Sequence, residues 1–386
     1  MENKTDFNQL KVRTRDFIYT KDDLFFATTN YIHPANRILS FLRYIPDENG
    51  DREKNGKNYR KVDSDEAYDY LRKNHPEYLY QCDITNIEMM GVPYDKISEV
   101  IKPEKRLKEI REEFNKIYEK NTKNKDELNT LNFYKKLIDL SDFFHYVAGI
   151  DYNNLGISGS ILPGLQKSEI SDLDFVVYGL KNHKIAVESF KNNKNKKITI
   201  IDENNENNEN NKSNKIKKTI TLNSIDNSYW EKVYDKRIKD ESLTKKEFIW
   251  YESRKNNRGV INGTLFDILA TKNYDEIKGN WGDVKYNNVG KASVECVVSD
   301  AIGSYDNPAI YKIKDMKITG GDDFPISEIA SFTHTYAGQV LEGEKIIAKG
   351  KVEEVIENKN LKYYRLVIGT TRESIDEYVK LKDGIY

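Results

Sequence analysis

Two aspartates, Asp172 and Asp174, lie two residues apart in an otherwise apolar run that ends in Phe-Val-Val-Tyr. Because side chains alternate between the faces of a β-strand, both carboxylates point to one face while Leu173 and Phe175 face a core. Two carboxylates held this close repel each other unless a divalent cation lies between them. Ligands that are all oxygen favour Mg²⁺ or Mn²⁺ over zinc. The pair predicts a metal-binding strand, although Asp-x-Asp alone also occurs at solvated strand ends.

A glycine-serine turn, Gly159-Ser160, lies upstream, and eleven residues separate Ser160 from Asp172. It follows a strand-like segment and leads to an apolar segment ending in Pro-Gly, so we expect a strand, a turn and the start of a short helix. Glycine lets backbone approach a phosphate closely, and N–H groups at a helix start can bind the anion together with the serine hydroxyl. The spacing allows the chain to return as the next strand, so we expect the phosphate site and the carboxylates to face one cleft.

Asp267 is the third expected metal ligand. It lies in the apolar run 264–269 directly after Asn262-Gly263, a dipeptide that favours a two-residue hairpin turn. A lone acid in an apolar strand is unfavourable to bury unless it is paired or metal-bound. A two-metal site needs such a further carboxylate. The alternative is an ordinary surface aspartate on an edge strand.

A helix is expected over residues 244–254, where Thr244 and Glu247 have the spacing of a capping box. Arg254 and Arg258 follow at its end, just before the predicted hairpin. We expect one of these arginines to contact the phosphates of a nucleotide or the backbone of an acceptor. The alternative is a solvated position in which they complement the helix dipole.

The first two of three expected domains cover residues 1–102 and 103–287. The first is a small α+β domain without a catalytic motif, in which residues 16–29 predict two short strands around a turn at Lys21-Asp22-Asp23. The second carries the segments above and begins with two amphipathic helices. Within it, residues 191–218 include the run ENNENNENNKSNK. This run is too polar to bury enough apolar surface, so we expect a disordered insertion here, preceded by the remnant of a strand at residues 198–201.

Residues 288–386 form the third expected domain. Five short alternating segments with Gly- and Asn-containing turns predict a small, OB-like β-barrel. Barrels of this kind often bind single-stranded nucleic acid, and a purely structural or protein-binding barrel is an equal alternative.

Composition excludes some classes of protein. The chain has 62 Lys and Arg residues against 63 Asp and Glu residues, which argues against a protein that coats nucleic-acid backbones by charge alone. Cys82 and Cys296 lack zinc-ligand spacing and are expected to be buried thiols without a chemical role. No signal-peptide-like run occurs, and no segment approaches the roughly 18 apolar residues of a membrane span. We therefore expect a cytoplasmic protein with no membrane partner.

The turn at Gly159-Ser160, the Asp172/Asp174 strand and the later strand acid Asp267 together resemble the DNA polymerase beta nucleotidyltransferase superfamily. The chain is more similar still to an archaeal group of predicted nucleotidyltransferases, through the segments RDFIYTKDDLFFA, KNNRGVINGTLFDIL and FTHTYAGQVLEGE. The insertion expected at 191–218 departs from the superfamily pattern.

The resemblance implies an α+β fold with a polymerase-beta-like catalytic core, and Mg²⁺-dependent transfer of a nucleotide from an NTP, with ATP expected. It implies that Asp172 and Asp174 bind two Mg²⁺ ions, for which Mn²⁺ can substitute, and that Asp267 binds the catalytic ion and assists deprotonation of an acceptor hydroxyl. In-line attack at the α-phosphate then releases pyrophosphate. The expected acceptor is RNA. The alternatives are transfer of AMP to a protein or a small molecule, and a nucleotide-binding regulator without turnover.

Overall fold

The computed structural model is a mixed α+β chain whose described part contains three sheets and six α-helices. It describes residues 10–84, 87–167, 171–202, 216–369 and 374–385. The chain forms two compact units, called unit 1 and unit 2 here. Unit 1 comprises Met1–Ile101, Asn227–Lys255 and Ala270–Tyr386, and unit 2 comprises Lys102–Asp226 and Asn256–Leu269. In the described ranges, no helix has both the length and the apolar character needed to cross a membrane.

The first sheet of unit 1 has eight strands in the order β4-β5-β3-β2-β1-β8, with β7 paired to β3 and β6. The predicted hairpin around residues 21–23 joins β1 to β2, and Asp23 in its turn has a φ of 60°. Helix α1 (Ser64–Asn74) buries Ala67 and Leu71 in the core of this sheet. The strands are β1 (Phe17–Thr20), β2 (Phe25–Thr28), β3 (Arg37–Pro46), β4 (Arg52–Lys54), β5 (Lys57–Lys61), β6 (Leu79–Cys82), β7 (Ile87–Pro93) and β8 (Ile97–Ile101), with short 3₁₀ turns η2 (Pro76–Tyr78) and η3 (Tyr94–Lys96).

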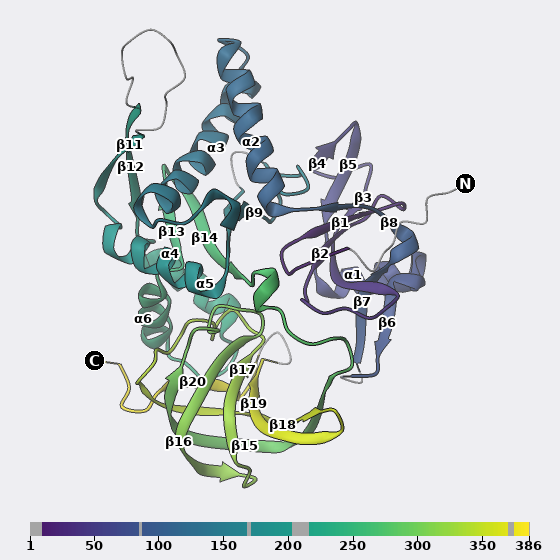
Figure 1. Ribbon diagram of the computed structural model, residues 1–386, viewed down its shortest axis with the longest axis vertical. Coiled ribbons are helices and arrows are strands. Elements are labelled where there is room, and N and C mark those ends of the chain that lie inside the picture. Colours follow the sequence, from purple (N-terminus) through teal and green to yellow (C-terminus); the bar gives the residue numbers. More distant parts are fainter. Residues whose placement is uncertain (1–9, 85–86, 168–170, 203–215, 370–373, 386) are drawn as a thin grey trace. The chain divides into compact units, whose positions relative to one another are not determined.

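The second sheet of unit 1 closes on itself (Figure 1). Its order is β15-β16-β17-β19-β18, and β18 also pairs with β15, which closes the sheet. Strand β20 pairs with β18. Strands β17 and β19 are parallel. Alternate side chains such as Val294 and Cys296 are buried inside. The strands are β15 (Val284–Asp300), β16 (Ala309–Gly321), β17 (Ile326–Ser331), β18 (Lys345–Glu357), β19 (Asn360–Ile368) and β20 (Tyr378–Leu381).

Helices α5 (Asn227–Arg237) and α6 (Lys245–Lys255) pack against each other, and Phe248 and Tyr251 of α6 lie in the core of this closed sheet. They therefore lie in unit 1, whereas the domain boundaries expected from the sequence place them in the catalytic domain. The predicted capping box at the start of α6 is confirmed. The backbone N–H of Thr244 donates to Oε2 of Glu247 at 2.8 Å, and the N–H of Glu247 donates to Oγ1 of Thr244 at 3.2 Å.

Unit 2 is built on a six-stranded sheet with the order β11-β12-β13-β14-β10-β9. Helices α2 and α3 run side by side (Figure 1) and, with α4, bury Leu107, Leu137 and Phe190 in its core. The helices are α2 (Pro103–Glu119), α3 (Lys125–Asp142), its π-helical continuation η4 (Phe143–Val147), the 3₁₀ turn η5 (Tyr152–Asn154) and α4 (Leu180–Asn193). The strands are β9 (Leu155–Ile157), β10 (Leu173–Tyr178), β11 (Lys197–Asp202), β12 (Ile216–Asn223), β13 (Arg258–Ile261) and β14 (Thr264–Thr271); the 3₁₀ turn η6 (Tyr274–Glu276) follows in unit 1.

Strand β11 confirms the strand expected at residues 198–201, and β11 and β12 together correct the expected disordered insertion at 191–218. They pair with each other over six residues, and Ile200 and Ile220 are buried. The hairpin forms because alternating isoleucines on both sides of the polar run supply it with an apolar face. Residues 203–215, which hold the polar run, lie outside the described residues.

A buried ion cluster joins this hairpin to the helices. Asp142 at the end of α3 accepts hydrogen bonds from Arg111 of α2 and Lys218 of β12. Burial opposes its ionisation, but Arg111 and Lys218 outweigh burial and hold the pKa of this carboxyl below its usual range. The cluster is consistent with a structural role, because each charge in it has an opposite partner.

Candidate active site

Strand β10 carries Asp174 and lies between β9 and β14 in the sheet of unit 2. Leu173, Phe175 and Val177 of this strand are buried in the core beneath the sheet. Side-chain alternation therefore places Asp174 on the opposite face. Asp172 precedes the strand by one residue and is exposed.

Strand β14 places Asp267 on the same face of the sheet as Asp174. Its neighbours Phe266 and Ile268 are buried in the core that also holds Phe175. Because β10 and β14 are adjacent strands, the two carboxylates lie on one side of neighbouring strands. The hairpin that delivers Asp267 has the predicted turn, in which Asn262 and Gly263 have φ values of 45° and 77°.

The Gly159-Ser160 turn packs directly on Asp174. Gly159 has a φ of 63°, and a Cβ atom at this position would lie 1.8 Å from Oδ2 of Asp174. The backbone N–H of Ser158 donates to the carbonyl of Asp174 at 2.8 Å. The Ser160 hydroxyl donates to Oγ of Ser171 at 3.2 Å. The structure thus brings the expected phosphate-binding turn to one of the expected metal ligands.

The short helix expected after this turn is not formed in residues 161–167, so that prediction is wrong for the described part of the segment. Residues 159–164 form turns, in which Gly164 N–H donates to the Ile161 carbonyl and Leu165 N–H to the Ser160 carbonyl. Pro163 has no N–H to donate, and Gly164 has a φ of 73°, which does not continue a right-handed helix. The backbone N–H groups that could donate to an anion beside Asp174 would therefore belong to a turn and not to a helix.

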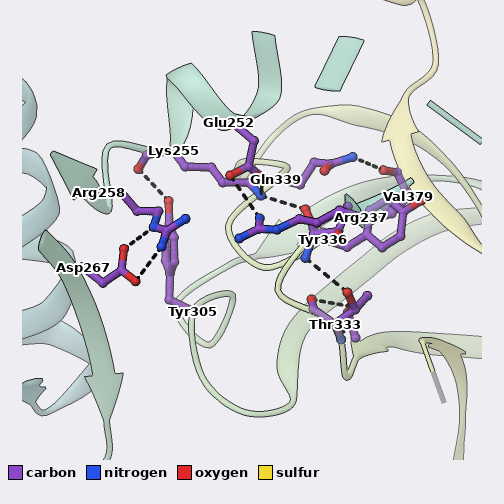
Figure 2. A network of polar contacts seen from close by, with 12 residues as sticks. Arg237, Glu252, Lys255, Arg258, Asp267, Tyr305, Thr333, Tyr336, Gln339 and Val379 are labelled. Carbon is purple, nitrogen blue, oxygen red and sulfur yellow. Dashed lines mark hydrogen bonds and ion pairs between the residues drawn. The ribbon is translucent and has the colours of Figure 1, made fainter. Parts of the chain in front are cut away.

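Asp267 is bound by Arg258, its cross-strand neighbour on β13 (Figure 2). The guanidinium donates twice to the carboxylate, once from Nε and once from Nη2 at 2.8 Å. Such a bidentate pair fixes both side chains. The strand itself is held by His183 of α4, whose Nε2 donates to the Ile268 carbonyl at 3.0 Å and whose side chain is buried.

The three aspartates are not gathered around one point in this structure. Within the described residues, Asp172, Asp174 and Asp267 do not place their ligand atoms within 4.8 Å of one another. The guanidinium of Arg258 already neutralises Asp267. The donors are all carboxylate oxygens, which fits Mg²⁺. Asp172 and Asp174 would hold such an ion, and Asp267 would join them only by leaving Arg258.

Arg254, the other predicted phosphate ligand, is engaged within unit 1. Its Nη2 donates to both carboxylate oxygens of Glu344, at 2.8 and 2.6 Å. Its guanidinium also lies 4.6 Å from the ring centre of Trp250. This arrangement favours a role in fastening α6 to the closed sheet.

Sequence reasoning missed a second polar cluster, which connecting segments beside the first sheet of unit 1 form. Ligand atoms of Asp22, His75 and Glu77 lie within 4.8 Å of one another, a grouping that separation along the chain conceals. The ammonium of Lys96 lies 3.0 Å from Glu77 and 3.2 Å from Asp22. Hydrogen bonds to these two carboxylates raise the pKa of Lys96, so the cluster already holds a cation.

Together these features define a mixed α+β protein in which one face of the unit 2 sheet carries Asp174 and Asp267. The Gly159-Ser160 turn packs on Asp174 at this face. No family model matches the chain. The chain is 38% identical over 382 residues to the uncharacterized protein MJ1086 of Methanocaldococcus jannaschii, covering 97% of this chain and all of that protein. The chain therefore belongs to the same family as this archaeal protein. No solved structure matches it.

Replacing Gly159 with alanine is expected to disturb both folding and the site. The left-handed backbone alone costs about 1–2 kcal/mol in any residue with a Cβ. The added methyl would also displace the Asp174 carboxylate, so we expect Mn²⁺ affinity to fall at least about tenfold, a change of about 1.4 kcal/mol. Urea unfolding and Mn²⁺ titration measure the two effects.

Gly149→Ala is the matched control for Gly159→Ala. Gly149, also in unit 2, has a φ of 70°, and among the described residues beyond its chain neighbours no atom would lie within 4 Å of a Cβ at this position. The variant should show the backbone penalty with unchanged Mn²⁺ affinity. Equal Mn²⁺ binding by both variants would show that the turn does not support Asp174.

Proposed function

We propose that unit 2 is a Mg²⁺-dependent nucleotidyltransferase, which moves an NMP from an NTP, with ATP preferred, to an acceptor hydroxyl. The observation that carries the proposal is the packing of the Gly159 turn against Asp174, on the sheet face that also bears Asp267. A glycine turn beside two carboxylates suits a metal-bound triphosphate.

Each residue has a proposed task. Asp172 and Asp174 hold Mg²⁺, and the N–H groups of the Gly159-Ser160 turn bind phosphate oxygens. Mg²⁺ supplies neutralisation of phosphate charge and a lower pKa for the acceptor hydroxyl. Arg258 leaves Asp267 for the triphosphate, and Asp267 then joins Asp172 and Asp174 as a metal ligand and takes the proton from the acceptor. The acceptor oxygen forms a bond to the α-phosphorus, the bond from the α-phosphorus to the bridging oxygen breaks, and pyrophosphate leaves.

The six-stranded sheet of unit 2 would be a polymerase-beta-like core. The closed sheet of unit 1 would be an OB-like barrel. Two features support this assignment: the parallel pair β17/β19 and the pairing of β15 with β18, which closes the sheet. The expected acceptor is RNA. Transfer of AMP to a protein or a small molecule is the alternative acceptor chemistry.

A second candidate, a nucleotide-binding regulator without turnover, is favoured by one observation. Asp267, the proposed third metal ligand, is occupied by the bidentate contact with Arg258. If this pair persists when nucleotide binds, the site has two metal carboxylates and no group to accept the acceptor proton.

Incubation with α-labelled NTPs, Mg²⁺ and total RNA or protein tests the proposal. We expect label to move to RNA, with release of pyrophosphate. Label on protein would show that the reaction occurs but that the acceptor is a protein and not RNA. Tight NTP binding without transfer to any acceptor would favour the regulator and contradict the enzyme.

Arg258→Ala separates the two candidates further. If Arg258 moves to the triphosphate, its loss should weaken NTP binding about tenfold, since hydrogen bonds to charged groups contribute about 1.5–3 kcal/mol. Asp267 would then be open to metal, so Mn²⁺ should bind more tightly in the absence of nucleotide. Calorimetric titration measures both affinities.

Arg254→Ala is the comparison for Arg258→Ala. It removes the contact with Glu344 in unit 1 and should leave NTP affinity unchanged while lowering the unfolding midpoint. Unchanged NTP affinity in Arg258→Ala would remove Arg258 from the nucleotide site.

A further inference from the structure

A hollow of about 300 Å³ lies on the closed sheet of unit 1, away from the residues of the proposed active site in sequence. It spans β15, β16 and β18, and the segment that precedes β20 forms one wall. The lining residues that matter here are Lys291, Ser293, Gly320, Lys349, Asp376 and Glu377.

Gly320 is a glycine that the fold does not require. Gly321 has a φ of 82°, and a Cβ there would lie 2.3 Å from the Lys291 carbonyl oxygen. A Cβ on Gly350 would lie 2.3 Å from the Val367 carbonyl oxygen. A Cβ on Gly320 would instead meet Ser293 atoms at 3.8 and 3.9 Å, an ordinary contact, and its φ is not left-handed. The missing side chain at 320 therefore leaves the hollow open.

Strand register builds the floor of the hollow from small residues. Ser293 of β15 pairs with Gly320 on one side and with Lys349 on the other. Ala292 and Ala348 are buried in the core, so alternation places Ser293 and Lys349 on the outer face. Lys291, two residues before Ser293, lies on the same face and pairs across the strands with Lys351. The result is a floor of small residues with Lys291 of β15 and Lys349 of β18 beside it.

The wall that residues 375–377 form beside Lys349 is acidic and partly apolar. The Lys349 ammonium donates to Oδ1 of Asp376 at 2.7 Å, and the Gly369 N–H donates to Oε2 of the buried Glu377 at 2.6 Å. Ile375 is 61% exposed at this wall. A ligand that is complementary to this hollow combines an anionic group for the lysines, a flat body for the floor and N–H donors for the carboxylates.

We propose that the hollow binds one nucleoside phosphate unit, with the base over Ser293 and Gly320 and the phosphate on Lys291 and on Lys349, whose ammonium also pairs with Asp376. The unit can be a free nucleotide or one residue of a single-stranded RNA. In the RNA form the inference rests on the proposed function, because the RNA would then be its acceptor. Lysine contacts to phosphate and a surface for a base are what sequence-tolerant binding of single strands requires.

Binding in EDTA tests the hollow without turnover. The probes are a 5′-fluorescent ten-nucleotide single-stranded RNA, followed by anisotropy, and AMP, followed by equilibrium dialysis. Gly320→Val fills the hollow in an extended strand, where valine is favoured over glycine, so its unfolding midpoint should stay equal or rise. We expect it to weaken binding of the probe at least about tenfold.

Lys291→Ala tests the phosphate contact, and Lys314→Ala, an exposed lysine of β16 outside the lining, is its control. Lys291→Ala should weaken RNA binding and reduce the slope of log K against log salt by about 0.7, the value for one phosphate contact on a single strand. Lys314→Ala should change the slope less. Equal slopes for the two variants would contradict a phosphate contact at Lys291.

The two ligand sources give different results. If AMP and RNA both bind and both are lost in Gly320→Val, the hollow binds the nucleoside phosphate unit from either source. Binding of RNA alone means that the ligand is a residue of a single strand. Binding of AMP alone means that the ligand is a free nucleotide. Absence of binding by the unaltered chain, or unchanged binding by Gly320→Val, overturns the inference. EDTA removes the metal that nucleotide transfer requires, so failure of this binding test and failure of the nucleotidyl-transfer assay can be told apart.

Discussion

Asp174→Asn is expected to lower the rate of nucleotide transfer by about a thousandfold, because losing about 4 kcal/mol of metal-based charge stabilisation changes a rate by that factor. Asparagine keeps the size of the side chain that packs on Gly159, so the fold should stay intact. Transfer from labelled ATP at saturating Mg²⁺ measures the rate, and an unfolding curve checks the fold.

Glu188→Gln provides the matched control for Asp174→Asn. Glu188 is an acid on α4 of the same unit, and its neutralisation removes the same charge away from the sheet face. It should keep nearly full activity. Comparable rates in both variants would mean that Asp174 does not hold the catalytic metal.

Lys255→Met is expected to lower the free energy of unfolding by about 3–5 kcal/mol, the usual effect of breaking a buried ion pair from one side. Lys255 and Glu252 of α6 have side chains that are each 2% exposed (Figure 2). The Lys255 ammonium also donates to the Thr335 carbonyl at 2.7 Å. The variant leaves the Glu252 carboxylate buried, with Arg237 at 3.4 Å as a more distant cationic partner. Urea unfolding followed by tryptophan fluorescence measures the loss.

The double variant Lys255→Met/Glu252→Leu makes this explanation specific. Replacing both charges with apolar side chains of similar volume is often neutral or stabilising, so most of the lost stability should return. If the double variant is as unstable as the single one, the packing of the methionine, and not an unpaired charge, causes the loss. Arg237 is 26% exposed and can turn to water when Glu252 is removed.

Local patterns in the sequence predict much of the fold. The hairpin at residues 16–29, the helix capped by Thr244 and the Asn262-Gly263 hairpin are confirmed, because each depends on turn or cap chemistry within a few residues. The five predicted strands of the third domain also occur, and the structure adds β20. The mixed α+β class is confirmed.

The features that the sequence does not reveal depend on contacts between distant residues. The pairing of Arg258 with Asp267 depends on strand register, which turns a predicted phosphate ligand and a predicted metal ligand into partners. Arg254 meets Glu344, ninety residues later in the chain. The apolar residues after Gly159 predict the start of a helix, but Pro163 and Gly164 prevent it.

A crystal structure with Mn²⁺ and a non-hydrolysable ATP analogue tests the proposed site most directly. Anomalous scattering locates Mn²⁺ without reference to any expected position. We expect an ion bound by carboxylate oxygens of Asp172 and Asp174, phosphate oxygens against the Gly159-Ser160 turn, and Asp267 released from Arg258. An ordered nucleotide bound elsewhere, with no Mn²⁺ at Asp172 and Asp174, would contradict the proposed site.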